Sequence, residues 1–175
     1  MEIRPARSTD LYGAALTRIA SWRAAFTGLV PQDFLDSMDA ETISAGWAAS
    51  IAAGRSRLYV AAATGTQPDC GRILGYAGTG PERDGPAHAG ELYALYVHPD
   101  AWGSGVGRAL LDAAARDLQQ AGCTTISLWV LEANERARAF YHRYGFTQTP
   151  NRTHSSLGQL PELRLSLDLR TSTTH

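Results

Sequence analysis

The stretch LYVHPDAWGSGVGRALL, residues 95–111, joins an apolar, β-prone run to a helical pattern through a glycine-rich turn. The apolar run ends at Pro99, and three glycines follow at alternating positions, Gly103, Gly105 and Gly107. Glycines at such a turn let backbone N–H groups approach a ligand closely, and the helix N-terminus adds a positive dipole end. Because one glycine would be enough for a tight turn, three of them predict an anion site, usually for phosphate.

Two common phosphate-binding loops do not fit this stretch. A dinucleotide-binding fingerprint needs glycine at the sixth position of G-x-G-x-x-G, where this chain has Arg108 or, counted from Gly105, Leu110. A P-loop needs a lysine before its Ser or Thr, and the chain contains no lysine. The loop therefore indicates another phosphate-bearing ligand.

Composition is that of an ordinary globular protein of one domain. The chain has 175 residues, 44% of them hydrophobic and 19% charged, with a formal net charge of −1. This balance argues against nucleic-acid binding through bulk electrostatics, and no apolar run approaches the roughly 18 residues that span a bilayer. The N-terminus has no apolar segment of the signal-peptide kind. We therefore expect a cytoplasmic protein that binds neither nucleic acid nor membrane.

The two cysteines give no sign of a metal site or of a covalent intermediate. Cys70 and Cys123 stand alone, without a second Cys or a His at metal-ligand spacing. We therefore expect two reduced thiols, no metal and no acyl-cysteine step.

Hydrophobic periodicity and turn residues predict strands and helices along the whole chain. Helices are expected at 9–26, after Pro31, and at 40–53, 105–121 and 134–145. Strands are expected at 2–5, 57–63, 72–80, 91–99, 124–131 and 160–169. This order predicts an α/β chain with one mixed sheet, organised as a single domain over residues 1–170 with a polar tail at 171–175.

The glycine loop resembles motif A of the Gcn5-related N-acetyltransferases, the GNAT family. That motif has the form Gln/Arg-x-x-Gly-x-Gly/Ala. Gly105 and Gly107 match it, whereas Trp102 stands where the family carries Gln or Arg. A site made of backbone N–H groups tolerates this difference, because the side chain is not what binds the anion.

A second stretch, NERARAFYHRYGF, resembles the family's motif B, N-x-x-A-x-x-x-Y-x-x-x-G-F. The matching positions are Asn134, Ala137, Tyr141, Gly145 and Phe146. Asn134 and Tyr141 are about two helical turns apart, so they lie near one face of a helix. Two motifs in the right order make the resemblance specific, and it covers about residues 2–168.

The resemblance implies a GNAT-like domain with a mixed, mostly antiparallel, twisted sheet of about 6–7 strands flanked by about 4–5 helices. It implies acetyl-CoA as co-substrate, with the pyrophosphate on the loop amides and the pantetheine arm along Val97. The N–H of Leu95 or of Tyr96 would hold the oxyanion.

Three arginines are either phosphate contacts or solvated helix residues: Arg108, Arg136 and Arg138. The full set of expected cofactor-binding residues is Leu95, Tyr96, Val97, Trp102, Gly103, Ser104, Gly105, Val106, Gly107, Arg108, Asn134, Arg136 and Tyr141.

Amide formation from a thioester needs a deprotonated amine, a stabilised oxyanion and a proton for the leaving thiolate. The resemblance assigns the acid to Tyr141, and the alternative is a buried core tyrosine. Glu91 is the predicted base, because it shares a strand face with Leu95 and Val97, where a carboxylate is costly unless it is used or paired. A salt bridge of Glu91 with an arginine, ordered water as the base, and Glu162 as the base stay open.

In this family the first two helices and the last strands build much of the acceptor pocket. Trp22, Phe26, Phe34 and Glu162 are the predicted acceptor-binding residues, although the aromatic ones fit a helix core equally well. Three acidic residues either attract a cationic amine or cap helices on a solvated face: Asp33, Asp36 and Asp39.

The sequence thus predicts an N-acetyltransferase that transfers the acetyl group of acetyl-CoA directly to a primary amine, of a small molecule by preference. A protein N-terminus or a lysine side chain is the alternative acceptor. A non-catalytic acyl-CoA-sensing module is the alternative class. Dimerisation is common in the family, so a homodimer is one expected assembly.

Overall fold

The computed structural model describes residues 1–65, 71–83, 85–86, 88–154 and 160–170. Its helices are α1 (Leu11–Phe26), α2 (Gln32–Ser37), α3 (Ala40–Ala52), α4 (Val106–Gln120) and α5 (Glu135–Tyr144), with short 3-10 helices at Ser8–Asp10 and Pro99–Ala101. Its strands are β1 (Glu2–Pro5), β2 (Arg57–Ala62), β3 (Ile73–Pro81), β4 (Ala89–Val97), β5 (Thr125–Leu131), β6 (Thr147–His154) and β7 (Pro161–Asp168). None of the described helices is both long and apolar enough to cross a membrane.

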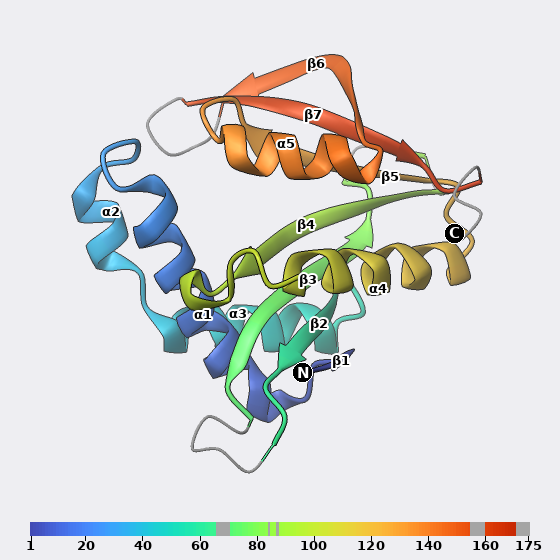
Figure 1. Ribbon diagram of the computed structural model, residues 1–175. Coiled ribbons are helices and arrows are strands. Elements are labelled where there is room, and N and C mark those ends of the chain that lie inside the picture. Colours follow the sequence, from blue (N-terminus) through green and yellow to red (C-terminus); the bar gives the residue numbers. More distant parts are fainter. Residues whose placement is uncertain (66–70, 84, 87, 155–159, 171–175) are drawn as a thin grey trace.

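The strands form one mixed sheet in the order β1-β2-β3-β4-β5-β7-β6 (Figure 1). Neighbours pair antiparallel except β4 and β5, which run parallel because α4 crosses between them. Their pairing is confined to residues 89–91 and 125–127, beyond which the two strands separate. The mixed α/β fold that the sequence predicts is confirmed, with seven strands and five α-helices in the described part of the chain.

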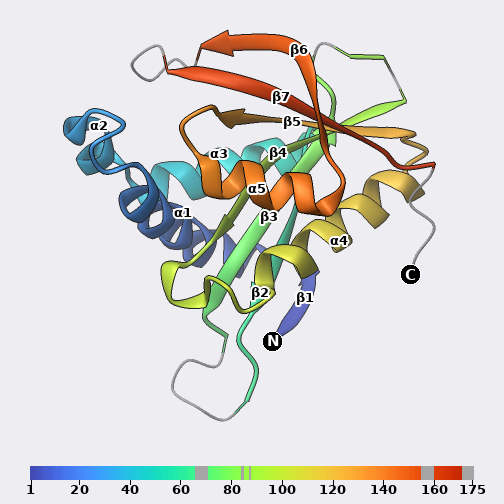
Figure 2. The ribbon, with the colours of Figure 1, turned by 45° about the horizontal axis from the view of Figure 1, so that its top comes forward.

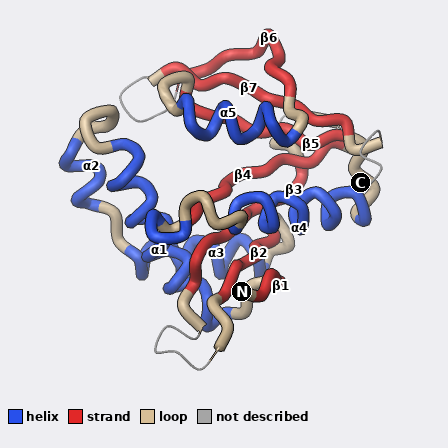
Figure 3. The backbone as a smooth tube through the Cα atoms, in the orientation of Figure 1, coloured by secondary structure: helices blue, strands red, loops and turns tan. Residues whose placement is uncertain are grey.

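Helices cover both faces of the sheet (Figure 2). The amphipathic α4 lies on one face together with α5, and Leu110, Leu111 and Ile126 are fully buried there. On the other face α1 and α3 enclose a smaller core around Tyr76 and Trp47. Figure 3 shows α2 beside α1, at the end of the sheet where β4 and β5 have diverged.

One strand, β6, has no counterpart in the sequence pattern. Its residues TQTPNRTH lack apolar alternation and include a proline. An edge strand needs neither feature, because it pairs on one side only and can accommodate a proline or a bulge. β6 is such an edge strand, and its register with β7 shifts between Gln148 and Arg152.

A β-bulge in β4 changes which of its residues share a face. Consecutive positions 78 and 79 of β3 pair with Ala94 and Leu92 of β4, so Tyr93 is an extra residue. An extra residue interrupts the alternation of side chains along a strand. Residues before the bulge therefore face the side opposite to the one that simple alternation predicts.

Candidate active site

The separation of β4 from β5 opens a cavity of about 240 Å³. Its walls come from α1, β4, β5, α5 and the start of β7. Residues from the predicted site that line it are Trp22, Phe26, Leu95, Tyr96, Asn134, Tyr141 and Glu162. The structure thus brings the second motif, the middle of β4 and two acceptor-side aromatic residues around one opening.

Hydrogen-bond alternation along β4 decides which main-chain groups face this opening. The His98 N–H donates to the Leu74 carbonyl of β3 at 2.8 Å, so His98 and, two residues earlier, Tyr96 direct their main-chain groups toward β3. Leu95 and Val97 therefore direct theirs away from β3, toward the opening. Of the two N–H groups predicted for the oxyanion, only that of Leu95 has this direction, and Tyr96 contributes its side chain to the wall instead.

The glycine loop forms the turn into α4, as its sequence predicts. Gly103 (φ 76°) and Gly105 (φ 87°) adopt left-handed conformations that favour glycine. Because α4 begins at Val106, the N–H groups of its first turn, through Arg108, have no partner within the helix. Gly107 lies inside the helix, where an added Cβ would meet its neighbours at ordinary van der Waals distance. Two of the three glycines therefore shape the turn.

Trp102 and Ser104 brace the loop through their side chains. The Trp102 indole N–H donates to the Val97 carbonyl at 2.8 Å, and the Ser104 hydroxyl donates to the Ala101 carbonyl at 2.7 Å. The guanidinium carbon of Arg136 lies 3.4 Å from the centroid of the Trp102 ring. This stacking brings a cation from α5 to the loop, and its partial burial lowers the pKa of Arg136.

The other two candidate arginines have partners away from the loop. The Arg108 Nε donates to the Asp112 carboxylate at 3.2 Å. Arg138 donates to the Glu132 carbonyl at 3.0 Å. Arg136 is therefore the one of the three that contacts a residue of the glycine loop.

Asn134 begins α5 by accepting a hydrogen bond from the Ala137 N–H at 3.1 Å. This cap gives the N-x-x-A part of motif B a structural reason. The cap occupies one lone pair of the Asn134 amide oxygen, so the second lone pair and the amide N–H groups are left for a ligand in the cavity that Asn134 lines.

Tyr141 lies on α5 with its side chain 8% exposed in the cavity wall. Its ring contacts Phe140 and Phe146 edge-on, with centroids 5.3 and 5.6 Å away. No described residue forms a hydrogen bond with its hydroxyl. Desolvation, and secondarily the Tyr96 phenol, raise the pKa of Tyr141 well above that of a free phenol. The hydroxyl therefore stays protonated across the physiological range.

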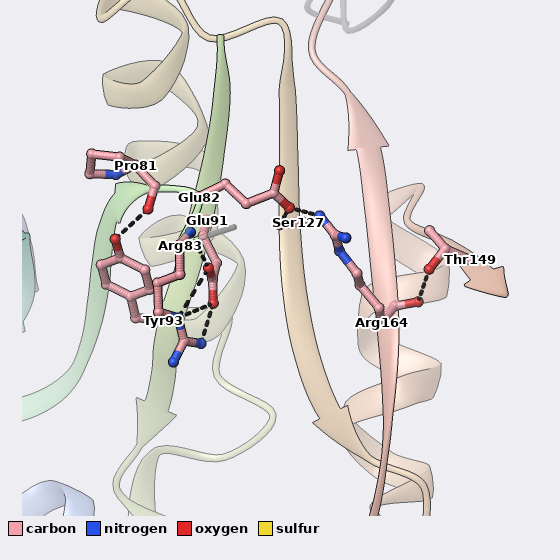
Figure 4. A network of polar contacts seen from close by, with 8 residues as sticks. All are labelled: Pro81, Glu82, Arg83, Glu91, Tyr93, Ser127, Thr149 and Arg164. Atoms are coloured by element: carbon pink, nitrogen blue, oxygen red, sulfur yellow. Dashed lines mark hydrogen bonds and ion pairs between the residues drawn. The ribbon is translucent and has the colours of Figure 1, made fainter. Parts of the chain in front are cut away.

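Glu91 does not line the cavity. The bulge at Tyr93 turns its side chain to the opposite face from Leu95 and Val97, so the predicted shared face is wrong. Its carboxylate is 3% exposed and accepts hydrogen bonds from the side chain and the backbone N–H of Arg83 (Figure 4). The structure therefore favours the salt bridge over the role of base.

Glu162, the second residue of β7, lies in the cavity wall opposite Leu131 of β5. Partial burial raises the pKa of its carboxyl group above the usual value, and the nearby Arg83 guanidinium opposes this only in part. A carboxylate with a raised pKa is better suited to accept a proton near neutral pH.

The predicted acceptor-side residues divide into two groups. Trp22 and Phe26 line the cavity. Phe34 of α2 does not line it, and instead packs against the Trp22 ring with centroids 5.6 Å apart. Phe34 is therefore a support for the wall, and its predicted place in the pocket is corrected.

The acidic residues of this region serve the helices. Asp39 accepts a hydrogen bond from the Thr42 N–H at 2.7 Å and begins α3. Asp36 accepts one from the Gln32 amide at 2.9 Å. None of Asp33, Asp36 and Asp39 lines the cavity, which favours a solvated face with helix-capping duty over attraction of a cationic amine.

The cysteines lie apart from this chemistry as far as the structure describes them. Cys123 follows α4 and is half-buried, and desolvation raises the pKa of its thiol. Cys70 falls outside the described residues. Over the described ranges, no group of three or more His, Cys, Asp or Glu side chains could hold a metal ion.

Comparisons with known proteins agree on one family. The sequence model of the Acetyltransferase (GNAT) family matches residues 18–146. The uncharacterized N-acetyltransferase YuaI of Bacillus subtilis is 32% identical over 143 residues, which cover 81% of this chain and 78% of YuaI. Mycothiol acetyltransferase of Propionibacterium freudenreichii is 40% identical over 79 residues, but this match spans only 25% of that protein.

Solved structures share the fold at low identity. YncA from Salmonella typhimurium, solved with acetyl-CoA, has a TM-score of 0.72 at 21% identity, covering 100% of this chain and 97% of that chain. The PaiA N-acetyltransferase from Thermoplasma acidophilum, solved with coenzyme A, has a TM-score of 0.71 at 20% identity, covering 93% and 96%.

Proposed function

The chain belongs to the GNAT family and is an acetyl-CoA-dependent acetyltransferase, and from this premise we propose that it transfers the acetyl group directly to the primary amine of a small molecule. The observation that carries the proposal is the cavity between β4 and β5. Leu95, Tyr141 and Glu162 all line this cavity. In this proposal they supply an oxyanion donor, an acid and a base around one opening.

The co-substrate would lie along β4 and end at the glycine loop. The backbone N–H groups of residues 103–108 would bind the pyrophosphate, with the Arg136 cation beside them. The Val97 carbonyl already accepts from Trp102, so the Val97 N–H is the simpler partner for the pantetheine arm. Support comes from the acetyl-CoA and coenzyme A complexes of YncA and PaiA, which share this fold.

The reaction then follows from three groups of this chain. Glu162 removes a proton from the bound ammonium, and the freed nitrogen lone pair attacks the thioester carbonyl carbon. The Leu95 N–H stabilises the oxyanion that forms. As the oxyanion collapses, the carbon–sulfur bond breaks and Tyr141 donates its proton to the leaving sulfur. The nitrogen, still positively charged after the attack, gives its second proton to the Tyr141 phenolate and so restores the phenol. The products are the acetylated amine and free coenzyme A.

Two features support a small acceptor. The cavity is bounded by Trp22 and Phe26 of α1 and by Val30, which follows it, and these three are at most 8% exposed. The cavity volume of about 240 Å³ is below the roughly 300–1,000 Å³ typical of drug-sized sites. A peptide or protein acceptor stays the alternative, and it needs a wider approach to the amine.

Initial-rate kinetics test this function directly. Coenzyme A release and the mass of the acetylated product would be followed against small amines, an N-terminal peptide and a lysine peptide. Direct transfer predicts intersecting double-reciprocal lines and full activity in the Cys123→Ala variant. Parallel lines with acetylated Cys123 would contradict it. Acetyl-CoA binding without turnover of any acceptor would indicate the sensing module.

A further inference from the structure

The acceptor side of the cavity is built largely of aromatic rings. Trp22, Phe26, Tyr93, Tyr96 and Trp129 line it, and they come from three separate elements. The Trp22 centroid lies 4.9 Å from that of Phe26 and 6.1 Å from that of Tyr96, so these three rings form a continuous part of the wall. Such a wall binds flat apolar groups by stacking and edge contacts.

Arginines stack on three of these rings without lining the cavity themselves. The guanidinium-to-centroid pairs are Arg18 on Trp22 (5.6 Å), Arg83 on Tyr93 (5.4 Å) and Arg164 on Trp129 (5.9 Å). All three rings line the cavity, whereas none of the three guanidinium groups does. The stacking fixes the rings and leaves their inner faces to a ligand.

Two of these arginines are also matched by buried carboxylates, at the end of the sheet where β4 and β5 still pair (Figure 4). Arg83 pairs with Glu91, and Arg164 pairs with Glu82. Among the described residues that line the cavity, Glu162 is the only charged one. The one charged side chain in the described wall is therefore a carboxylate, and the Arg83 cation offsets its charge only in part.

On the premise of the proposed amine acetylation, we propose that the acceptor is a primary amine on a flat apolar body of one or two rings, with no carboxylate next to the amine. The ammonium group would lie at Glu162, and the flat body against Trp22, Tyr96 and Trp129. A carboxylate beside the amine would meet Glu162, whose charge the Arg83 cation offsets only in part, because Arg83 is paired with Glu91 and does not line the described cavity wall. A polyamine would find no second carboxylate for its further charges among the described residues of the cavity wall.

Matched amine pairs test the acceptor class. Phenethylamine and L-phenylalanine differ only in the carboxylate, as do tryptamine and L-tryptophan. We expect kcat/KM for each amine to exceed that for its amino acid by at least about 100-fold, because the site leaves the carboxylate unpaired. Spermidine serves as the polycationic comparison and should also be a poor acceptor.

Two variants test the residues behind this selectivity. Glu162→Gln should narrow the ratio between phenethylamine and phenylalanine, a change that loss of a base alone would not produce. Trp129→Leu should raise the KM for the amine and leave the KM for acetyl-CoA little changed. Trp47→Leu on α3 is the matched control outside the cavity, and Glu41→Gln is the matched charge control.

A binding measurement separates failure of the acceptor class from failure of the enzymatic function. Phenethylamine would be titrated calorimetrically into the protein saturated with coenzyme A. Binding of phenethylamine but not of phenylalanine, without turnover, would keep the acceptor class and contradict the enzymatic function. Turnover of amino acids or spermidine as fast as the arylalkylamines would overturn the acceptor class alone. Absence of phenethylamine binding would overturn it as well.

Discussion

Replacing Tyr141 by phenylalanine removes one hydroxyl group and leaves the ring in place. The edge contacts with Phe140 and Phe146 survive, and no described hydrogen bond is lost. Because the hydroxyl lies in the cavity wall and has no described partner, we expect the free energy of unfolding to stay within about 1 kcal/mol of the wild-type value. A positioned acid contributes about 10²–10⁴-fold to rate, and the lower end applies here because a thiolate with a pKa of about 8.5 leaves readily. The expected fall in kcat is therefore about 100-fold.

The assay for this variant combines three readouts. Coenzyme A release gives kcat, thermal unfolding gives stability, and titration with acetyl-CoA gives its affinity, which should not change. Tyr144→Phe is the control on the same helix, because its hydroxyl donates to Asp112 at 2.8 Å and does not line the cavity. That control should lose about 1 kcal/mol of stability and keep its kcat. A Tyr141→Phe variant with wild-type kcat and normal stability would refute the assignment of the acid.

Three further predictions concern the base, the buried ion pair and the glycine loop. Glu162→Gln should lower kcat/KM by about 100-fold at neutral pH and abolish the acidic limb of the pH–rate profile. In the wild type this limb should lie above the ordinary glutamate range, because the pKa of Glu162 is raised. Since desolvation penalises the ionised form of Glu162, the same variant should unfold at a slightly higher temperature at neutral pH. This gain in stability should disappear as the pH falls below the pKa of Glu162. An unchanged acidic limb of the pH–rate profile would exclude Glu162 as the base. Glu91→Gln should lower the free energy of unfolding by about 1–2 kcal/mol, measured with denaturant, and the loss is no larger because Arg83 is exposed. The variant should keep the wild-type pH–rate profile. A shifted profile would indicate that Glu91 acts as the base. Trp102→Ala should raise the KM for acetyl-CoA about tenfold with kcat retained, because the glycine loop loses the indole hydrogen bond and the stacking of Arg136 on Trp102. An unchanged KM for acetyl-CoA would contradict the role of Trp102 in bracing the loop.

Much of this arrangement follows from local sequence rules. The glycine turn, the helix that begins at Val106 and the cap at Asn134 all depend on residues next to one another in the chain. Such features can be predicted because backbone conformation and capping are decided within a few residues. The order of helices and strands follows from the same local signals, and so the fold class could be predicted from the sequence.

The base could not be assigned in this way, because it depends on strand pairing. The extra residue Tyr93 exists only relative to β3, and it decides that Glu91 faces away from Leu95. One signal was present in the sequence, since Gly78 and Gly80 lie within β3 next to the bulge, and glycine inside a strand often marks such a site.

The aromatic wall of the cavity was likewise only partly predictable. Tyr93 and Trp129 line it, yet each lies in an apolar strand run that gives no sign of a ligand site. They become neighbours of Trp22 only because β4 and β5 separate where α1 packs. A domain boundary at residue 170 and a homodimer stay predictions.

The central claim is that the thioester reacts in the opening between β4 and β5, and a crystal structure with coenzyme A and an amine would test it most directly. The account predicts the sulfur within about 3.5 Å of the Tyr141 hydroxyl, the pantetheine arm along Val97 and the pyrophosphate on the amides of residues 103–108. It also predicts the amine nitrogen beside Glu162. A coenzyme A sulfur outside this cavity, or an amine bound away from Glu162, would contradict the account.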